Sequence, residues 1–539
     1  MKKLHHHILL LAALICMCAC KRDFLQRQAT NAIPEENVFK DPALMQLFVN
    51  NMYLDIPSFD ATLYDNITDE SRSYWGGYPL NVVQGQWFAD NNPMEYWPYE
   101  AIRKANMFLE KIDDAPVEEE ERAALKGQVK FLRAMHYFNM VKRYGGVPII
   151  TEPQELTDDL FVKRQTTDAC FDFIIRELEE AAELLPKTYG GATIDVGKAN
   201  QYSAKAFLGR VHLFRASPLF NPSGDVAKWE KAAAANKEVM DADVYDLHPN
   251  FRSIMLDKNN EEEIFSVQFL RPYREHGWDS WAMPDSRSKQ SAVCRSPLQE
   301  FVDAFEMKNG KAINEPGSGY DATNPYVNRD PRFDATLIVN GSTFGYQGLP
   351  VYMYVDAPID GINKPYATIT GYLMRKGTNE SNKDYYGNSG SDQNWQELRY
   401  AEVLLNYAEA RNEVLGAPDQ SVYDAIERIR QRAGLTPYQL PAGLSKTVMR
   451  ERIRHERYIE LAFEQKRYWD LRRWKIAADK LNGKTFHAMY ITRQNNGTYT
   501  YEAKPATQGP YVFQEKMYFM PIPQREIEKN PNLEQNTGW

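Results

Sequence analysis

Residues 118–144 (EEEERAALKGQVKFLRAMHYFNMVKRY) predict the clearest helix of the chain. Apolar side chains recur there every three or four positions, which places them on one face of an α-helix. These side chains are Leu125, Val129, Leu132, Met135, Phe138 and Val141. Two glycines follow directly, and Pro148 prevents the helix from resuming. The fold should therefore be built around packed helices.

Further helices are expected on both sides of this segment. They cover residues 43–53, 100–113, 167–185, 199–217, 226–241, 396–415, 421–433 and 445–466. Small side chains at Ala204, Ala206 and Gly209 suit close packing of one helix on another. The pattern resembles tetratricopeptide helices, in which helical hairpins stack on one another. The predicted fold class is therefore mostly α, with helical hairpins over about residues 100–245 and 396–475.

Two long stretches without helical periodicity interrupt these helices, at about residues 55–98 and 250–395. Gly, Pro, Asn, Asp and Tyr dominate the second stretch. Short extended pieces are expected at residues 263–268, 335–339, 352–355 and 518–523. Insertions of this length in a compact protein are usually functional. We therefore expect a single domain over residues 43–539, in which the two stretches form a loop-rich ligand-binding face.

The first 19 residues have the features of a secretory signal peptide, a basic start followed by the apolar run ILLLAALI. This run is far shorter than the roughly 20 residues that a membrane-spanning helix needs. The segment ends in a sequence that resembles a lipoprotein signal-peptidase site, with Cys20 as the acylated first residue of the mature chain. Cys18 is less suitable because the bulky Met17 precedes it. An ordinary signal peptide with incidental cysteines is the alternative.

The residues after Cys20 favour the outer membrane as the location. Lys21 stands where an aspartate would indicate retention in the inner membrane. Residues 20–42 are polar and lack periodicity, so they should form a lipidated N-terminus and a tether. Several acyl chains give lasting anchorage, because each buried CH₂ contributes about 0.8 kcal/mol and one chain alone is marginal.

Composition and motifs exclude several classes of function. The net charge of −9 without a basic run argues against a nucleic-acid partner. Apart from the signal peptide and Cys20, only Cys170 and Cys294 remain, too few for a disulfide framework. The motifs H-E-x-x-H and G-x-S-x-G do not occur. No cofactor is predicted; loops 221–225 and 258–263 could hold structural calcium, although solvated turns are favoured there.

Seven segments together resemble the SusD/RagB family, nutrient-binding outer-membrane lipoproteins of Bacteroidetes. They are residues 130–148 (KFLRAMHYFNMVKRYGGVP), 217–221 (SPLFN), 329–333 (RDPRF), 401–411 (AEVLLNYAEAR), 453–474 (IRHERYIELAFEQKRYWDLRRW), 520–527 (MPIPQREI) and 530–536 (NPNLEQN). The charges in 453–474 alternate in sign, which also predicts ion pairs that lock helices together.

The resemblance implies a helical core of four tetratricopeptide-like hairpins and a loop-rich face that binds an oligosaccharide. It also implies a SusC-like TonB-dependent transporter as the partner, a lipid anchor in the outer membrane, a position at the cell surface and no enzymatic activity. A peptide-binding branch of the family is the alternative. A cell-surface glycoside hydrolase is a third possibility, because such an enzyme needs only two carboxylates.

The candidate ligand residues lie in the loops, because a sugar needs exposed aromatic rings for its C–H face and polar side chains for its hydroxyls. Three clusters offer this mixture, in residues 64–97, 274–287 and 372–386. The candidates are Asp69, Arg72, Trp75, Trp87, Asn91, Trp278, Trp281, Arg375 and Tyr386. The alternative for each tryptophan is an anchor that fixes its loop to the core. Trp87 is the first choice, since it lies mid-loop between polar residues.

Overall fold

The computed structural model describes residues 35–59, 64–75, 77–190, 195–287, 294–362, 364–384 and 389–539. Its helices are α2 (Glu35–Val38), α3 (Pro42–Met52), α4 (Tyr78–Val83), α5 (Tyr99–Lys111), α6 (Glu119–Tyr144), α7 (Thr167–Leu184), α8 (Gln201–Ala216), α9 (Val226–Asp241), α10 (Trp278–Ala282), α11 (Gln299–Ala304), α12 (Arg332–Thr336), α13 (Tyr400–Val414), α14 (Gln420–Ala433), α15 (Lys446–Glu460), α16 (Arg467–Arg473), α17 (Ala477–Leu481) and α18 (Gln524–Lys529). The fold is mostly helical, as predicted.

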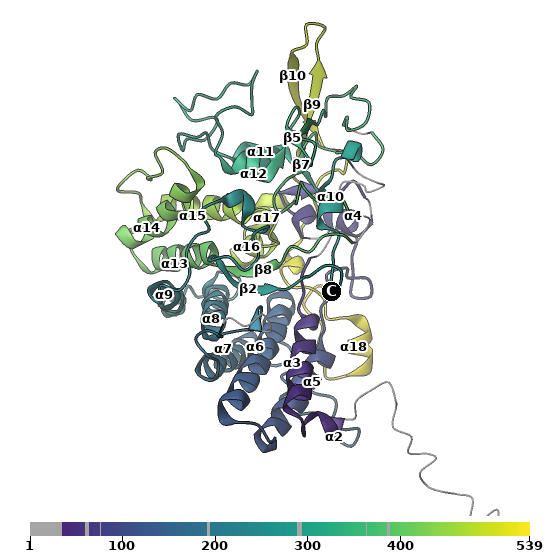
Figure 1. Cartoon of the computed structure of the whole chain (residues 1–539), viewed down its shortest axis with the longest axis vertical. Coiled ribbons are helices and arrows are strands. Elements are labelled where there is room, and N and C mark those ends of the chain that lie inside the picture. The colour runs from purple at the N-terminus through teal and green to yellow at the C-terminus, as the bar shows by residue number, and fades with distance from the viewer. Residues whose placement is uncertain are drawn as a thin grey trace, which may run out of the picture.

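The strands are short and occur in antiparallel pairs. They are β1 (Ser71–Arg72) with β3 (Ser296–Pro297), β2 (Glu263–Val267) with β8 (Trp395–Arg399), β4 (Leu337–Ile338) with β7 (Leu373–Met374), β5 (Thr343–Phe344) with β6 (Leu349–Pro350), and β9 (His487–Arg493) with β10 (Tyr499–Pro505). Figure 1 shows α3 and α5–α8 toward one end of the molecule, β2 and β8 near its middle, and β5, β7, β9 and β10 toward the other end. The β9–β10 hairpin projects from that second end (Figure 1).

The helical hairpins are confirmed. Helices α6, α7, α8 and α9 pack against one another in sequence order, and α13 packs on α8, α9, α14 and α15. Side-chain caps define several helix starts, since Thr166 accepts a hydrogen bond from Ala169 and Asn200 accepts one from Ser203. The helices predicted in residues 43–241 begin and end within two residues of their observed bounds.

Four predicted segments are wrong, wholly or in part. Residues 396–399 are not the start of a helix; they belong to strand β8, which pairs with β2 before α13 begins. The helix predicted to residue 466 ends at Glu460, because Phe463 and Gln465 adopt left-handed backbone angles that an α-helix does not allow. The strand predicted at 335–339 is limited to residues 337–338, and residues 352–355 form no strand.

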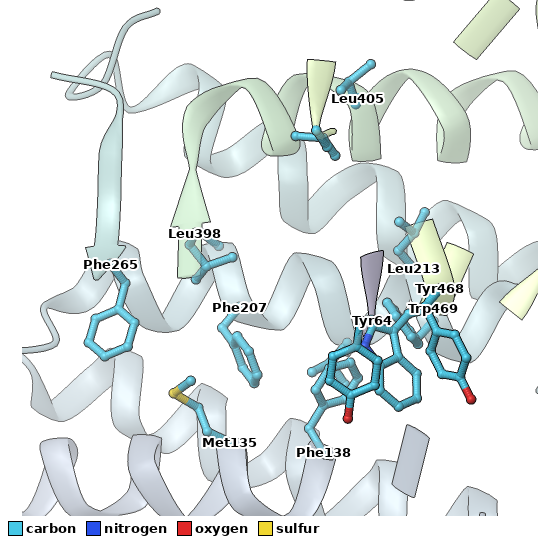
Figure 2. Packing of buried hydrophobic residues seen from close by; sticks show 14 of the residues in the cluster. Tyr64, Met135, Phe138, Phe207, Leu213, Phe265, Leu398, Leu405, Tyr468 and Trp469 are labelled. Carbon is cyan, nitrogen blue, oxygen red and sulfur yellow. The ribbon is translucent and has the colours of Figure 1, made fainter. Parts of the chain in front are cut away.

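Aromatic side chains join the β2–β8 pair to the helices. Phe131 of α6 lies edge-to-face against Phe265 of β2 at 5.0 Å, and Phe138 lies edge-to-face against Phe207 of α8 at 5.3 Å. Figure 2 shows Phe207, Phe265 and Leu398 in the same layer of the core. Such ring pairs contribute about 0.5–1.5 kcal/mol each beyond the area they bury. The loop-rich part of the chain is therefore packed firmly on the helical part.

A buried set of charged side chains joins the same two parts, and we refer to it as the ionic seam. Its members are Glu262, Glu306, Asp330, Arg332, Lys376, Arg399, Arg430, Arg432, Glu456, Glu460 and Glu464. The Arg399 guanidinium lies 2.6 Å from Glu262 and 2.8 Å from both Glu460 and Glu464. The ion pairing predicted for residues 453–474 is confirmed by these contacts.

Candidate functional site

Three aromatic rings gather on the surface of the loop-rich part, and we refer to them as the aromatic platform. Trp75 lies 5.8 Å from Tyr74 and 6.1 Å from Tyr366, and the two tyrosine rings are 5.9 Å apart. Trp75 is 49% exposed and Tyr366 is 50% exposed. Tyr74 is partly buried. Large aromatic side chains are normally covered, so a group of three in which two rings are half exposed defines a contact surface.

Strand β1 holds the first side of the platform. Ser71 and Arg72 pair with Pro297 and Ser296 of β3, which fixes the backbone just before Tyr74. The Ser73 carbonyl accepts a hydrogen bond of 2.7 Å from the Gln508 side chain. The chain leading to Tyr74 and Trp75 is therefore held by backbone pairing on one side and by a distant glutamine on the other.

A strained turn holds the second side. Ala367 N–H donates to Lys364 C=O at 3.1 Å, and Tyr366 has a φ of 63°. Pro365 precedes it, as in a type II turn, where the third position normally requires glycine. A tyrosine in this left-handed region costs about 1–2 kcal/mol. Strain of this kind is retained where a side chain must point in a particular direction.

The loop after this turn is tied to β3 and to the β9–β10 hairpin. The buried Thr368 hydroxyl accepts hydrogen bonds from three backbone N–H groups and donates to the Tyr372 carbonyl at 2.7 Å. Ile369 N–H donates to the Ser296 hydroxyl at 3.3 Å, and Met489 N–H donates to Thr370 C=O at 2.8 Å. Strand β3 thus contacts both sides of the platform.

Asp69 and Arg72 are not exposed, so the expectation that they line an open site is wrong. Asp69 receives hydrogen bonds of 2.9 and 2.7 Å from Arg467 of α16. The Arg72 guanidinium donates to the Thr68 and Ser71 carbonyls and stacks 5.0 Å from the Phe486 ring. The contacts of both side chains fix the loop that precedes Tyr74 in the sequence to the body of the protein.

Trp87 and Trp278 are also buried, at 2% and 0% exposure, so the expectation that they form sugar platforms is wrong. The Trp87 ring lies 4.5 Å from the Trp539 ring. The Trp278 indole N–H donates to the Lys376 carbonyl at 3.2 Å. The loops around them are polar, but their backbones pack on the core, and the tryptophans are the anchors.

The remaining candidates that the structure describes have other surroundings. Asn91 is exposed and accepts a hydrogen bond from Phe88 N–H within its own turn. Arg375 is partly buried and pairs with Glu380 at 2.7 Å, which holds the pKa of that carboxyl below its usual value despite burial. Trp281 is partly buried in α10. Tyr386 and Cys20 lie outside the described residues.

Tyr74 and Tyr366 were not among the sequence candidates. Tyr74 belongs to the first aromatic cluster, next to Trp75, but of these two residues only the tryptophan is a candidate ligand residue. Tyr366 precedes the third cluster, which begins at residue 372. The signal for Tyr366 was the run Asn363-Lys364-Pro365-Tyr366, an aromatic residue within a strong turn sequence. A tyrosine at that turn position has little chance to reach the core.

Comparisons with known proteins identify the family. A family model described as SusD family matches residues 261–539, and one described as "Starch-binding associating with outer membrane" matches residues 23–213. The chain belongs to the SusD family. A SusD-like protein of Formosa agariphila is 24% identical over 99% of both chains.

Solved structures agree with this assignment. A SusD-like protein of Bacteroides fragilis is 29% identical with a TM-score of 0.79, over 94% of this chain and 99% of the other. A SusD-like carbohydrate binding protein of the same species is 25% identical with a TM-score of 0.78, over 92% of this chain and all of the other. Across the described ranges, none of the helices combines the length and the apolar composition that crossing a bilayer requires.

Proposed function

We propose that the protein is a non-catalytic lipoprotein of the outer membrane that captures an oligosaccharide on the aromatic platform and passes it to a TonB-dependent transporter. The observation that carries the proposal is the cluster in which the exposed rings of Trp75 and Tyr366 lie beside the partly buried Tyr74. Its support from relatives is the similarity to a carbohydrate binding SusD-like protein and the match to a starch-binding family model.

The chemistry of the platform suits a sugar chain. Pyranose rings present C–H groups on one face, and these pack on the π-face of an aromatic ring. An aromatic contact contributes about 0.5–1.5 kcal/mol beyond its buried area. Three rings within 6.1 Å of one another can contact successive sugar units or two faces of one unit. This arrangement gives useful affinity for an extended chain without a deep pocket.

The nearby carboxyl groups are unsuited to hydrolysis. A glycosidase needs two carboxyl groups that face the scissile bond. Asp69 and Glu70 are close to the platform in sequence, but both are buried, and Asp69 is paired with Arg467. Burial, together with the negative charges of Asp65 and Asp69, raises the pKa of Glu70 well above its usual value. The burial and pairing of these carboxyl groups indicate that they stabilise the fold of the loop.

The test is the change Trp75→Ala. Native gels loaded with soluble starch, laminarin, xylan and mannan should show retardation of the unchanged protein by at least one glycan. Trp75→Ala should lower the affinity for that glycan about tenfold or more. The melting temperature should be unchanged, because the exposed part of the ring is contact area for the ligand. Trp278→Ala should instead lose about 3–5 kcal/mol of stability, as expected for a core tryptophan.

Tyr273→Ala is the matched control, because Tyr273 is 87% exposed and lies outside the platform. This variant should bind like the unchanged protein. Equal binding by Trp75→Ala would refute the platform. Release of shorter sugars from any of the glycans would show a hydrolase, and binding of peptides with no retardation by glycans would favour the other branch of the family.

The lipid anchor has its own test. Cys20→Ala should give a folded protein that no longer sediments with outer membranes of cells that lack the transporter partner, because acyl chains supply the lasting membrane affinity. Cys18→Ala is the control and should leave sedimentation unchanged. A Cys20→Ala protein that still sediments in such cells would show that another part of the chain binds the membrane.

A further inference from the structure

A second recess lies among the helices, away from the aromatic platform, and we refer to it as the tyrosine cleft. Its volume is about 430 Å³, within the usual range for small-ligand sites. Its aromatic lining is Tyr189, Tyr202 and Tyr245, together with the buried Phe265 of β2. The residues that form it lie at 188–189 and within 195–202, before and at the start of α8, and within 244–268, which lead into and include β2.

The three tyrosine rings are partly exposed, and hydrogen bonds hold Tyr189 and Tyr245 in place. The Tyr202 and Tyr245 rings meet at 86°, with centroids 6.3 Å apart, so they form a corner. Asn200 donates a hydrogen bond to the Tyr245 hydroxyl, and the Tyr189 hydroxyl donates to Ala199 C=O at 3.0 Å. A flat ligand can therefore stack on one ring and meet the edge of the other.

Polar side chains opposite the rings offer both donors and acceptors. Asn259, Asn260, Glu261, Glu263 and Gln268 line this side. The buried Asn394 donates to Asn259 at 3.2 Å and to Glu263 at 3.3 Å, which fixes their orientation from behind. A surface with rings on one side and fixed amides and carboxylates on the other matches the C–H face and the hydroxyl groups of a sugar.

The net charge of the tyrosine cleft indicates which sugars it can bind. Asp195 is neutralised by Lys198 at 2.8 Å. Within the described part of the chain, His248 is the basic side chain that contacts Glu261, at 3.2 Å, and Glu263 accepts hydrogen bonds from Ser266 and Asn394. The cleft therefore carries an excess of negative charge, which repels carboxylated and sulfated sugars and accepts neutral ones.

We infer that the tyrosine cleft is a second carbohydrate-binding site, which takes a neutral sugar unit by stacking on Tyr202 or Tyr245. This site does not depend on the aromatic platform, since the two share no residue and come from different segments. In Figure 1, α8 lies left of the centre of the molecule, whereas α4, the helix that follows Trp75, lies to the right and nearer the β9–β10 hairpin. Two sites on one molecule raise the apparent affinity for long glycans far more than for short ones.

The experiment measures sugar binding to the chain from residue 21 onward by saturation-transfer NMR. The probes are glucose, galactose, mannose, xylose and N-acetylglucosamine, with galacturonic acid as the charged counterpart of galactose, each up to about 100 mM, above the millimolar affinity expected for a single sugar unit. Crystals soaked with the strongest binder locate the site. The variants are Trp75→Ala, Tyr245→Ala, Tyr245→Phe and Glu261→Lys.

We expect at least one neutral sugar to bind, and its affinity should be unchanged in Trp75→Ala. The affinity should fall fivefold or more in Tyr245→Ala. It should be kept in Tyr245→Phe, because this variant retains the ring. Galacturonic acid should bind only to Glu261→Lys. Density for the sugar should lie beside Tyr202 and Tyr245. Glu261 is exposed, so its replacement does not threaten folding.

Three outcomes would overturn the inference: no binding of any neutral sugar by Trp75→Ala, equal binding by Tyr245→Ala, or equal binding of galactose and galacturonic acid by the unchanged protein. The proposed function fails separately. Glycan retardation that is insensitive to Trp75→Ala but abolished by Tyr245→Ala would remove the platform and keep the cleft.

Discussion

Single tryptophans in similar polar loops have opposite roles in this protein. Trp75 is half exposed beside two tyrosines, whereas Trp87 and Trp278 are buried anchors. Local sequence does not separate the two cases, because the difference depends on where the backbone of each loop lies relative to the core. The positions that the sequence singled out therefore contain one member of the aromatic platform and several members of the scaffold.

Tyr366 provides the test at this scale, since its left-handed backbone angle can be separated from its ring. Tyr366→Gly and Tyr366→Ala both remove the ring, so both should weaken glycan binding. Only glycine adopts a φ of 63° without strain. Tyr366→Gly should therefore be about 1 kcal/mol more stable than Tyr366→Ala in urea unfolding. Equal stability would show that the turn relaxes and that strain does not set the direction of the ring.

At the scale of elements, the sequence was most informative about the helices and least about the strands. The long amphipathic helix at 119–144 is predicted almost to the residue, because its periodic apolar face is a local property. Strand β8 was mistaken for the start of a helix, since its pairing with β2 joins residues more than a hundred positions apart. The β9–β10 hairpin was not predicted, although Asn495-Asn496-Gly497 is a strong turn sequence.

The contact between the hairpin and the Tyr366 loop can be tested at Gly371. Its φ is 81°, and a Cβ there would lie 2.3 Å from the Met489 carbonyl oxygen of β9. Gly371→Ala must therefore displace the loop or the strand, so glycan affinity should fall although no ring is removed. Gly348→Ala is the matched control, with a φ of 59° and open space around it.

Both variants carry the backbone cost of a left-handed alanine, about 1–2 kcal/mol. The additional loss of affinity in Gly371→Ala then reports the displacement alone, as measured by calorimetry with the retarding glycan. If both glycine variants bind equally, the hairpin does not position the aromatic platform.

At the scale of the whole molecule, buried charge joins segments that are distant in sequence. Besides the ionic seam, Glu409 of α13 accepts hydrogen bonds of 2.7 Å from Arg473 and from the Trp474 indole. The positive charge of Arg473 lowers the pKa of Glu409 from 4.5 to about 2, in spite of burial, which acts in the opposite direction. Breaking such a pair on one side costs about 3–5 kcal/mol because a buried charge remains.

The pKa of Glu409 gives a prediction for acid stability. A carboxyl whose pKa is lower in the folded state stabilises that state fully above its unfolded pKa, here 4.5, and the contribution disappears as the pH falls to about 2. The stability of the protein relative to Glu409→Gln should therefore decrease by about 3 kcal/mol between these pH values. Urea unfolding of both proteins at several pH values measures this difference in the free energy of unfolding.

Glu528→Gln, which changes an exposed carboxyl, is the control and should track the unchanged protein. A stability difference between the protein and Glu409→Gln that does not vary with pH would contradict the assignment of a low pKa to this pair.

The contact between Trp539 and Trp87 has a consequence for the order of folding. Trp539 covers the Trp87 ring and donates its indole N–H to the Lys516 and Phe519 carbonyls, at 3.1 and 2.9 Å. The two tryptophans are more than 400 positions apart in the sequence. Closing so long a stretch of chain costs entropy before the contact contributes any energy, so contacts of this kind form slowly. The ring of Trp87 should therefore be covered late in folding, after the local helical hairpins have formed.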